Sequence, residues 1–306
     1  MQLVRGIHNI QVDDHGCVLT IGNFDGVHLG HQQVITALVD KAKALNCVAA
    51  VLIFEPQPQE FFSPETAPAR LCRLRDKYIF LAKLGVQRQI CVNFNQQFAS
   101  QNAQYFIENL LVNKLGIKHL IIGDDFHFGK NRQGDFSMLC NAGKALNFEV
   151  SDTKSYKVAQ SRISSTLIRQ ALEQDDLAKA KAMLGREYSI IGRVFHGDKR
   201  GRQLGFPTAN VLLKRHNSPL SGVFAVKIKT IDGMFNGVAN IGARPTVAGI
   251  RQQLEVHIFD FDENLYGQNI EVVIKKKLRS VIKFNSLEAL TEQIHQDSEQ
   301  AKEALA

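Results

Sequence analysis

Apolar runs and helix-like segments alternate through the first half of the chain. One apolar run ends at about Ile21, an uninterrupted one covers 47–54, and shorter, mostly apolar segments follow at 90–94 and 118–122. Short runs of this kind are typical of strands that are buried on both faces of a parallel sheet. Between them, apolar residues recur at i, i+3 and i+4, which indicates helices. These helices are expected at 29–44, 76–84 and 101–115.

This alternation predicts βαβ units and an open parallel sheet, which places the first half in the α/β class. Ligands of such sheets bind beyond the carboxyl ends of the strands. Three loops leave those ends, and we expect them to converge on one site. The loops cover residues 22–31, 55–62 and 123–134.

The pattern changes at about residue 185. Before that point two helices are expected, one capped by a serine and running through Leu172, the other at 176–184. From Tyr188 onward, short alternating runs and frequent glycines indicate a small antiparallel β-barrel. Its strands are expected at 188–196, 222–231, 234–241, 252–260 and 269–277.

Apolar residues spaced along 286–304 predict a terminal helix after the barrel. We therefore expect two domains, 1–184 and 185–306, which suits a chain of 306 residues. No apolar run approaches the ~20 residues that span a bilayer. Since the first residues also lack the apolar stretch of a signal peptide, the cytoplasm is the expected location.

Charge and cysteine content narrow the partners. The formal net charge of +7 is divided about evenly between the two halves. A nucleic-acid-binding protein more often concentrates its basic residues in one stripe, so the surplus favours small polyphosphate ligands. We expect neither a nucleic-acid nor a membrane partner. The five cysteines are scattered and form no Cys-x-x-Cys pair, which argues against a disulfide framework and a thiolate zinc site.

The first candidate for chemistry is the glycine-rich turn at 21–31, Ile-Gly-Asn-Phe-Asp-Gly-Val-His-Leu-Gly-His. His28 and His31 are three residues apart at the expected start of a helix, so both imidazoles face one side of its first turn. Free backbone N–H groups and the helix dipole attract phosphate to such a place. Two histidines alone would more often be surface residues, but the surrounding glycines favour a phosphate site.

A resemblance to a known family rests on these residues. His28-Leu29-Gly30-His31 matches the His-x-Gly-His motif of the nucleotidyltransferase superfamily, and Gly-x-Phe-Asp-Gly-x-His-x-Gly-His resembles the bacterial bifunctional riboflavin kinase/FAD synthetases. The resemblance implies a Rossmann-like, nucleotidyltransferase-type first domain that transfers AMP from ATP to FMN. Such an enzyme must neutralise charge on the leaving pyrophosphate, which is the role implied for both histidines.

Two further segments resemble nucleotide loops of that family. They are Ile-Ser-Ser-Thr-x-x-Arg at 163–169 and Gly-x-Asp-Phe-x-Phe-Gly at 123–129, where His127 replaces the arginine of many relatives. The resemblance implies that ATP is bound by Gly22, Phe24, Asp25, His28, His31, Asp125, Arg162, Ser164, Ser165, Thr166 and Arg169. It also implies that Pro56, Pro58 and Phe62 receive the flavin.

A second motif lies in the other predicted domain. Glycines and cations cluster at 192–210, as in loops that close over phosphates, although the spacing is not that of a P-loop. Gly-Phe-Pro-Thr-Ala-Asn at 205–210 resembles the riboflavin kinase signature. The resemblance implies ATP binding by Gly197, Lys199, Gly201, Gly205, Pro207, Thr208 and Asn210. It also implies that Thr208 and Asn210 hold Mg²⁺, a cation that prefers hard oxygen ligands.

A kinase must also orient or deprotonate the accepting hydroxyl. Glu255, on the predicted strand 252–260, matches the family's catalytic base for the 5′-hydroxyl of riboflavin. His257 shares its face of the strand and is interpreted as structural. Arg279 is an implied flavin contact, although the basic run 275–279 is more often a solvated face.

We therefore predict a bifunctional enzyme that uses riboflavin, FMN and ATP, with Mg²⁺ as cofactor. Two other functions fit part of the pattern. A cytidylyltransferase acting on another phosphate acceptor leaves Gly-Phe-Pro-Thr-Ala-Asn unexplained. A non-catalytic, flavin-responsive regulator has no need for both sets of reactive residues. The oligomeric state is left open.

Overall fold

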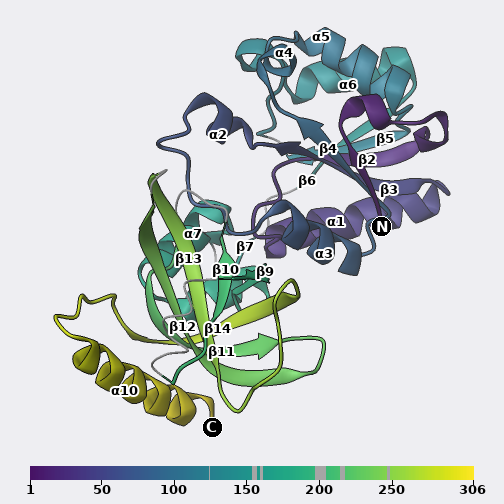
Figure 1. Cartoon of the computed structure of the whole chain (residues 1–306). Helices are drawn as coiled ribbons and strands as arrows, with labels where there is room; N and C mark the ends of the chain where they lie inside the picture. The colour runs from purple at the N-terminus through teal and green to yellow at the C-terminus, as the bar shows by residue number, and fades with distance from the viewer. Residues whose placement is uncertain (124, 154–156, 159–160, 197–204, 214–217, 247–248) are drawn as a thin grey trace. The chain divides into compact units, whose positions relative to one another are not determined.

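The computed structural model describes the chain apart from residues 124, 154–156, 159–160, 197–204, 214–217 and 247–248 (Figure 1). The described residues form two compact units. The first consists of residues 1–68 and 72–164, and the second of residues 69–71 and 165–306. Within this described part, no helix is both long and apolar enough to cross a membrane.

The first unit is built on a six-stranded sheet whose neighbouring strands run parallel, in the order β1-β4-β3-β2-β5-β6. Its strands are β1 (Gln2–Arg5), β2 (Cys17–Ile21), β3 (Val48–Glu55), β4 (Arg88–Asn93), β5 (His119–Gly123) and β6 (Glu149–Thr153). The predicted open parallel sheet is confirmed. Strands β1 and β6 extend it at its two edges beyond the strands that the apolar runs indicated.

Helices connect the strands of this sheet. They are α1 (Leu29–Ala44), α2 (Pro58–Phe62), α3 (Leu74–Lys83), α4 (Gln96–Ala99), α5 (Ala103–Tyr105), the π-helical η3 (Phe106–Lys114) and α6 (Phe136–Leu146). Shorter elements are η1 (Ile7–Asn9), η2 (Val12–Asp14), η4 (Lys130–Arg132), β7 (Lys157–Val158) and β8 (Ser161–Arg162). The helices predicted at 29–44 and 76–84 are present, and the one predicted at 101–115 is formed by α5 and η3 together.

Two apolar cores cover the two faces of the sheet. Val51 and Ile53 of β3 pack with α1 and α3 on one face. Leu52, which lies between them in the strand, packs with η3 and α6 on the other. Alternate side chains of a strand point to opposite faces, so a strand covered on both sides needs an unbroken apolar run. This explains why 47–54 contains no alternation.

The second unit is a closed barrel whose neighbouring strands are antiparallel, in the order β10-β13-β12-β11-β14-β9. Its strands are β9 (Ser189–Phe195), β10 (Ala209–Leu212), β11 (Gly222–Lys229), β12 (Met234–Thr246), β13 (Gly249–Ile258) and β14 (Asn269–Arg279). The five strands predicted from alternation are present. The sixth, β10, closes the barrel by pairing with β9 and β13 and begins inside the Gly-Phe-Pro-Thr-Ala-Asn segment.

Three helices belong to the second unit: α7 (Ser165–Glu173), α8 (Leu177–Leu184) and α10 (Leu287–Leu305). The compact units therefore divide between Ser164 and Ser165, ahead of the predicted boundary at 184/185. Residues 69–71 are held to later residues of this unit by hydrogen bonds. The Arg169 Nε donates to the Ala69 carbonyl, and the Tyr188 hydroxyl donates to the Leu71 carbonyl over 3.1 Å.

Candidate functional site

The loop between β2 and α1 has a constrained backbone. Gly26 has φ +83°, and two non-glycine residues, Phe24 and Val27, have φ +46° and +42°. Positive φ is unfavourable for residues with a Cβ and is found where the surrounding structure imposes it, often at functional sites. The Phe24 ring also lies against Gly22, where an added Cβ would be 3.2 Å from the ring. The loop is therefore held in one conformation ahead of the two histidines.

The two histidines are fixed side by side at the start of α1. His28 is the N-cap, and its Nδ1 accepts a hydrogen bond from the His31 backbone N–H over 3.3 Å. Their rings stack with centroids 3.6 Å apart. A Cβ at Gly30 would approach the His28 ring to 3.2 Å, so a larger residue at this position would require the ring to shift. The arrangement places two imidazoles beside the positive end of a 16-residue helix.

Asp25 connects this loop to Cys72. It is 3% exposed, and its Oδ1 accepts a hydrogen bond from the Cys72 backbone N–H over 3.1 Å. The Gly26 N–H donates to the Cys72 Sγ over 3.1 Å. Burial, with a smaller contribution from Asp25, raises the pKa of the Cys72 thiol to about 12. Cys72 is therefore a protonated, structural residue and not a nucleophile, and the role of Asp25 in ATP binding stays a prediction.

A row of phenylalanines runs through the first unit from α2 to the 123–129 loop. Neighbouring rings have centroids 5.2 to 6.2 Å apart. Phe62 ends the row and is 64% exposed. Pro58 is the first residue of α2, and Pro56 follows a cis peptide bond. The row consists of Phe54, Phe61, Phe62, Phe94, Phe98, Phe106, Phe126 and Phe128.

The remaining residues predicted to bind ATP at the first site are divided between the units. An added Cβ at Gly30 would lie 3.9 Å from the Ile163 carbonyl oxygen, so the segment before Ser164 passes beside the histidine helix. Asp125 crowds Gly123, where an added Cβ would be 3.0 Å from its Oδ1. Ser165, Thr166 and Arg169 lie in α7 of the second unit, and the side chain of Arg162 lies outside the described residues. Their predicted roles at this site stay predictions.

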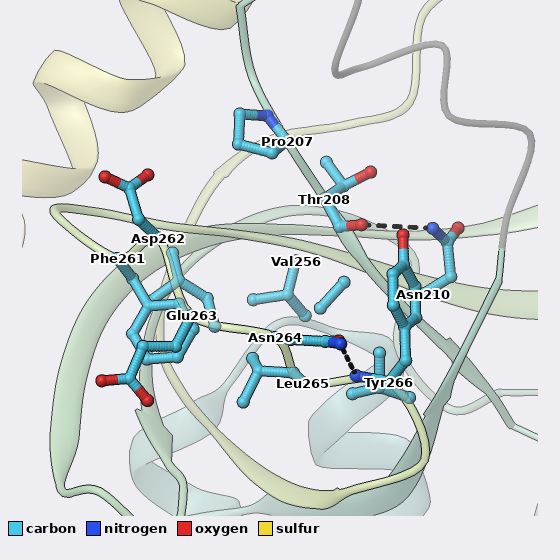
Figure 2. A pocket seen from close by; sticks show the side chains of 13 residues that line it. Pro207, Thr208, Asn210, Val256, Phe261, Asp262, Glu263, Asn264, Leu265 and Tyr266 are labelled. Carbon is cyan, nitrogen blue, oxygen red and sulfur yellow. Dashed lines mark hydrogen bonds between the residues drawn. The ribbon is translucent and has the colours of Figure 1, made fainter.

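The barrel contains a cavity of about 440 Å³ beside the Gly-Phe-Pro-Thr-Ala-Asn segment (Figure 2). Pro207, Thr208 and Asn210 line it, and their predicted roles in binding ATP stay predictions. Sequence reasoning missed the rest of its wall. Figure 2 labels most of this wall, namely Val256, Phe261, Asp262, Glu263, Asn264, Leu265 and Tyr266; Val194, Ala209 and Ile258 also line the cavity.

Glu255 reaches this region through a hydrogen-bonded chain. It pairs directly with Asn210 across β10 and β13. Its side chain is on the opposite face of β13 from Val256, and it is not among the residues that line the cavity. The Gln253 amide nitrogen donates to the Asn210 Oδ1 and, over 3.2 Å, to the Glu255 Oε1. Gln253 was not predicted, although its position two residues before Glu255 places it on the same strand face.

His257 supports the signature segment. Its Nδ1 lies 2.9 Å from the Pro207 carbonyl oxygen, and its ring packs edge-on against Phe206. Gly205, which precedes Phe206, has φ +84°. This is a conformation that glycine adopts without strain. The predicted phosphate-binding residues Gly197, Lys199 and Gly201 lie outside the described part of the chain.

Arg279, predicted to contact flavin, forms a bidentate ion pair. Its Nε and Nη2 donate to the Asp297 carboxylate of α10 over 2.8 and 2.7 Å, and its Nη1 donates to the Ser280 carbonyl over 3.0 Å. Arg279 therefore ties the terminal helix to β14. A flavin contact by this side chain stays a prediction.

The donor atoms at the barrel site suit a small hard cation. Thr208 and Asn210 line the cavity, and their side chains carry a hydroxyl and an amide oxygen. Among the described residues, no group of three His, Cys, Asp or Glu side chains could hold a metal ion by itself. Mg²⁺ commonly uses one or two protein oxygens together with substrate phosphates, so this sparse donor set fits it.

Comparisons with known proteins agree with both motifs. The FAD synthetase model matches residues 10–167 and the riboflavin kinase model matches residues 184–305. The bifunctional riboflavin kinase/FMN adenylyltransferase of Haemophilus influenzae is 54% identical over 99% of this chain and 98% of its own, and that of Escherichia coli K12 is 50% identical over 99% and 97%. A crystal structure titled macrolide-efflux protein, from Streptococcus pneumoniae, shares 28% identity over 99% of both chains with a TM-score of 0.79. The chain therefore belongs to the family of bifunctional riboflavin kinase/FMN adenylyltransferases, with the FAD synthetase region ahead of the riboflavin kinase region.

Proposed function

We propose that this chain carries out two ATP-dependent reactions in the cytoplasm. The barrel phosphorylates riboflavin to FMN and releases ADP. The first unit then transfers AMP from ATP to FMN, which yields FAD and pyrophosphate. One observation carries the proposal: each family match coincides with the motif of its own reaction, since 10–167 holds the two histidines and 184–305 holds Gly-Phe-Pro-Thr-Ala-Asn.

At the first site, a phosphate oxygen of FMN attacks the α-phosphorus of ATP. The bond to the α,β-bridging oxygen breaks, and pyrophosphate leaves with the electron pair. This in-line displacement needs no protein nucleophile; it needs fixed donors where charge develops. The stacked His28 and His31 at the start of α1 supply such donors, and their fixed positions avoid a reorganisation cost during the reaction.

We propose that the flavin ring is bound at the exposed end of the phenylalanine row, where Phe62 is 64% exposed beside Pro58. A planar isoalloxazine ring gains most from aromatic partners that are already positioned. Phe61 and Phe94 lie against Phe62 and hold its ring in place. The exposure of Phe62 supports this proposal, because an aromatic residue that served only the apolar core would seldom be so exposed.

At the second site, the 5′-hydroxyl oxygen of riboflavin attacks the γ-phosphorus of ATP and the bond to the β,γ-bridging oxygen breaks. We propose that Glu255 orients that hydroxyl and accepts its proton. Thr208 and Asn210 would hold Mg²⁺ and the ATP phosphates, and the bound ion would offset charge on the phosphate oxygens. The pairing of Asn210 with Glu255 across two strands supports roles in one reaction.

Flavin products separated by chromatography test these assignments. The full chain is incubated with ATP and Mg²⁺, first with riboflavin and then with FMN. Glu255→Gln should abolish FMN formation and leave FMN-to-FAD conversion unchanged, whereas His28→Ala should do the reverse. Loss of both activities from either folded variant would contradict the assignment of two separate sites. A wild-type protein that makes no FMN from riboflavin would contradict the kinase assignment.

A further inference from the structure

Gln253 joins two groups of the proposed kinase site through one amide. The side chain is buried, with 8% exposure, and its nitrogen carries two hydrogens. That nitrogen donates to the Asn210 Oδ1 and to the Glu255 Oε1, the latter over 3.2 Å. One hydrogen is therefore available for each acceptor.

The neighbouring contacts determine how both amides are oriented. The Asn210 amide nitrogen donates to the Thr208 carbonyl over 3.3 Å, so its oxygen faces Gln253 (Figure 2 shows the Asn210–Thr208 bond). A flipped Gln253 amide would place an oxygen against two other oxygens. Because buried acceptors without donors are costly, the network permits one arrangement.

A donor between these two oxygens is needed because they are both acceptors. Asn210 and Glu255 are cross-strand partners whose side chains lie on neighbouring strands. An amide oxygen and a carboxylate oxygen repel each other, so without a donor the two side chains would separate. In phosphoryl transfer, the cation and the accepting hydroxyl must both be positioned correctly around the transferred phosphorus. The distance between the side chains that hold them, Asn210 and Glu255, therefore affects the rate.

We propose that Gln253 is a positioning residue of riboflavin phosphorylation, which sets the Mg²⁺-binding oxygen of Asn210 and the carboxylate of Glu255 in register. The inference rests on the proposed function of the barrel. Gln253 is not among the residues that line the cavity, so in this proposal it acts through the two side chains that it bridges.

The alternative is that Gln253 only fills space. Methionine has nearly the same length and volume but no donor, so Gln253→Met separates packing from hydrogen bonding. Gln253→Glu keeps the shape but places an oxygen and a charge against Asn210 and Glu255. The adjacent Gln252 is partly exposed and lies on the opposite face of β13, so Gln252→Met is the matched control.

The kinetic test measures FMN formation from riboflavin, with FMN-to-FAD conversion in the same preparation as the control activity. We expect Gln253→Met to lower kcat by about 10- to 100-fold, the range for a lost hydrogen bond to a charged or reacting group. The KM for riboflavin should be unchanged. Gln253→Glu should lose more activity than Gln253→Met, while Gln252→Met should match the wild type. Wild-type kcat in the Gln253→Met protein would overturn the proposal.

A binding measurement gives a readout that does not depend on turnover. Mn²⁺ replaces Mg²⁺, and electron paramagnetic resonance measures free Mn²⁺ in the presence of ADP. We expect about tenfold weaker Mn²⁺ binding in Gln253→Met. This is the lower end of the roughly 10- to 100-fold range seen when a metal ligand loses its outer hydrogen-bond partner. Unchanged Mn²⁺ binding would overturn the link to Asn210.

A double-variant cycle tests the link to Glu255. If Gln253 acts through that carboxylate, the effect of Gln253→Met on kcat should shrink in the Glu255→Asp background, where the carboxylate is kept but withdrawn by one methylene, so that a residual kinase activity can be measured. An undiminished effect would overturn this part. If the methionine variant fails to fold, Gln253→Asn is used instead, because it keeps the amide but withdraws it by one methylene. Failure of the kinase assignment itself is recognised separately, by a wild-type protein that makes no FMN.

Discussion

The ion pair between Arg279 and Asp297 should determine whether α10 stays attached to the barrel. Asp297 is 3% exposed and accepts hydrogen bonds from Arg279 through both oxygens, over 2.8 and 2.7 Å. The Gln293 side chain donates a third, over 3.0 Å. The substitution Asp297→Asn keeps the shape of the side chain but removes its charge and faces the Arg279 donors with an amide nitrogen or a single oxygen.

The expected cost follows from this geometry. Removing one partner of a buried ion pair typically costs 3–5 kcal/mol, because the other charge is left uncompensated. The Arg279 side chain retains 20% exposure and its bond to the Ser280 carbonyl, which lessens the penalty. We therefore expect a loss of about 2–3 kcal/mol in the unfolding free energy of the second unit. For a unit of this size the unfolding temperature should fall by roughly 5–10 °C.

Differential scanning calorimetry measures the shift, and hydrogen exchange read by mass spectrometry locates it. Amides of 287–305 should lose protection in Asp297→Asn. The control on the same helix is Glu299→Gln, because Glu299 pairs with Lys302 over 2.8 Å at an exposed position and exposed ion pairs contribute little to stability. Equal shifts in both variants, or unchanged protection of α10, would refute the reasoning. An altered KM for riboflavin in Asp297→Asn, beyond that of the control, would support the predicted flavin contact of Arg279.

Three further predictions concern the first unit. Gly30→Ala places a Cβ 3.2 Å from the His28 ring, so FMN-to-FAD conversion should fall at least tenfold in kcat while FMN formation is unchanged; a wild-type rate would contradict the stacking argument. Burial lowers the pKa of His119, although its contact with Glu149 opposes this shift. Below about pH 6.5 the folded state therefore binds fewer protons than the unfolded state, so the unfolding temperature should drop from pH 7 to pH 5. His119→Gln should make the unfolding temperature depend less on pH over this range. The Cys72 thiol, with its pKa raised to about 12, should resist iodoacetamide at pH 8 in the folded chain, and modification as fast as in the unfolded chain would show that the loop opens.

Local periodicity was sufficient for most of the fold. Unbroken apolar runs predicted buried parallel strands such as β3, and alternation predicted barrel strands such as β13, because each pattern reflects how many faces of a strand are covered. Strand β10 was missed because four residues carry too little periodicity and because pairing with β9 and β13, far away in sequence, creates it.

The division of the chain into compact units was harder to predict from the sequence. Helices α7 and α8 follow the first sheet in sequence, yet they group with the barrel. The contact of Arg169 with Ala69 joins residues 100 positions apart. No local pattern of hydrophobicity carries information about such a contact. The family matches end at 167 and begin again at 184, so they leave the same segment unassigned.

Candidate site residues were predictable where a motif is contiguous. His28, Gly30 and His31 lie within four residues, and their mutual geometry is set by one helix turn. The hydrogen bonds of Gln253 could not be predicted from the sequence, because they depend on which residues pair across β10 and β13. The same holds for Arg279, whose partner Asp297 lies on another element.

The two sites limit motion by different means, and this explains why they should respond differently to mutation. At the first site, positive-φ residues and a glycine whose added Cβ would crowd the His28 ring fix the histidines through the backbone. Added bulk is therefore expected to be more harmful there than loss of a polar partner. At the second site, strand pairing fixes the backbone, and hydrogen bonds among Asn210, Gln253 and Glu255 fix the side chains. Isosteric loss of a donor should therefore be more harmful there than a small change in volume. A Gln253→Met variant as active as the wild type, or a Gly30→Ala variant that adenylylates FMN normally, would contradict this distinction.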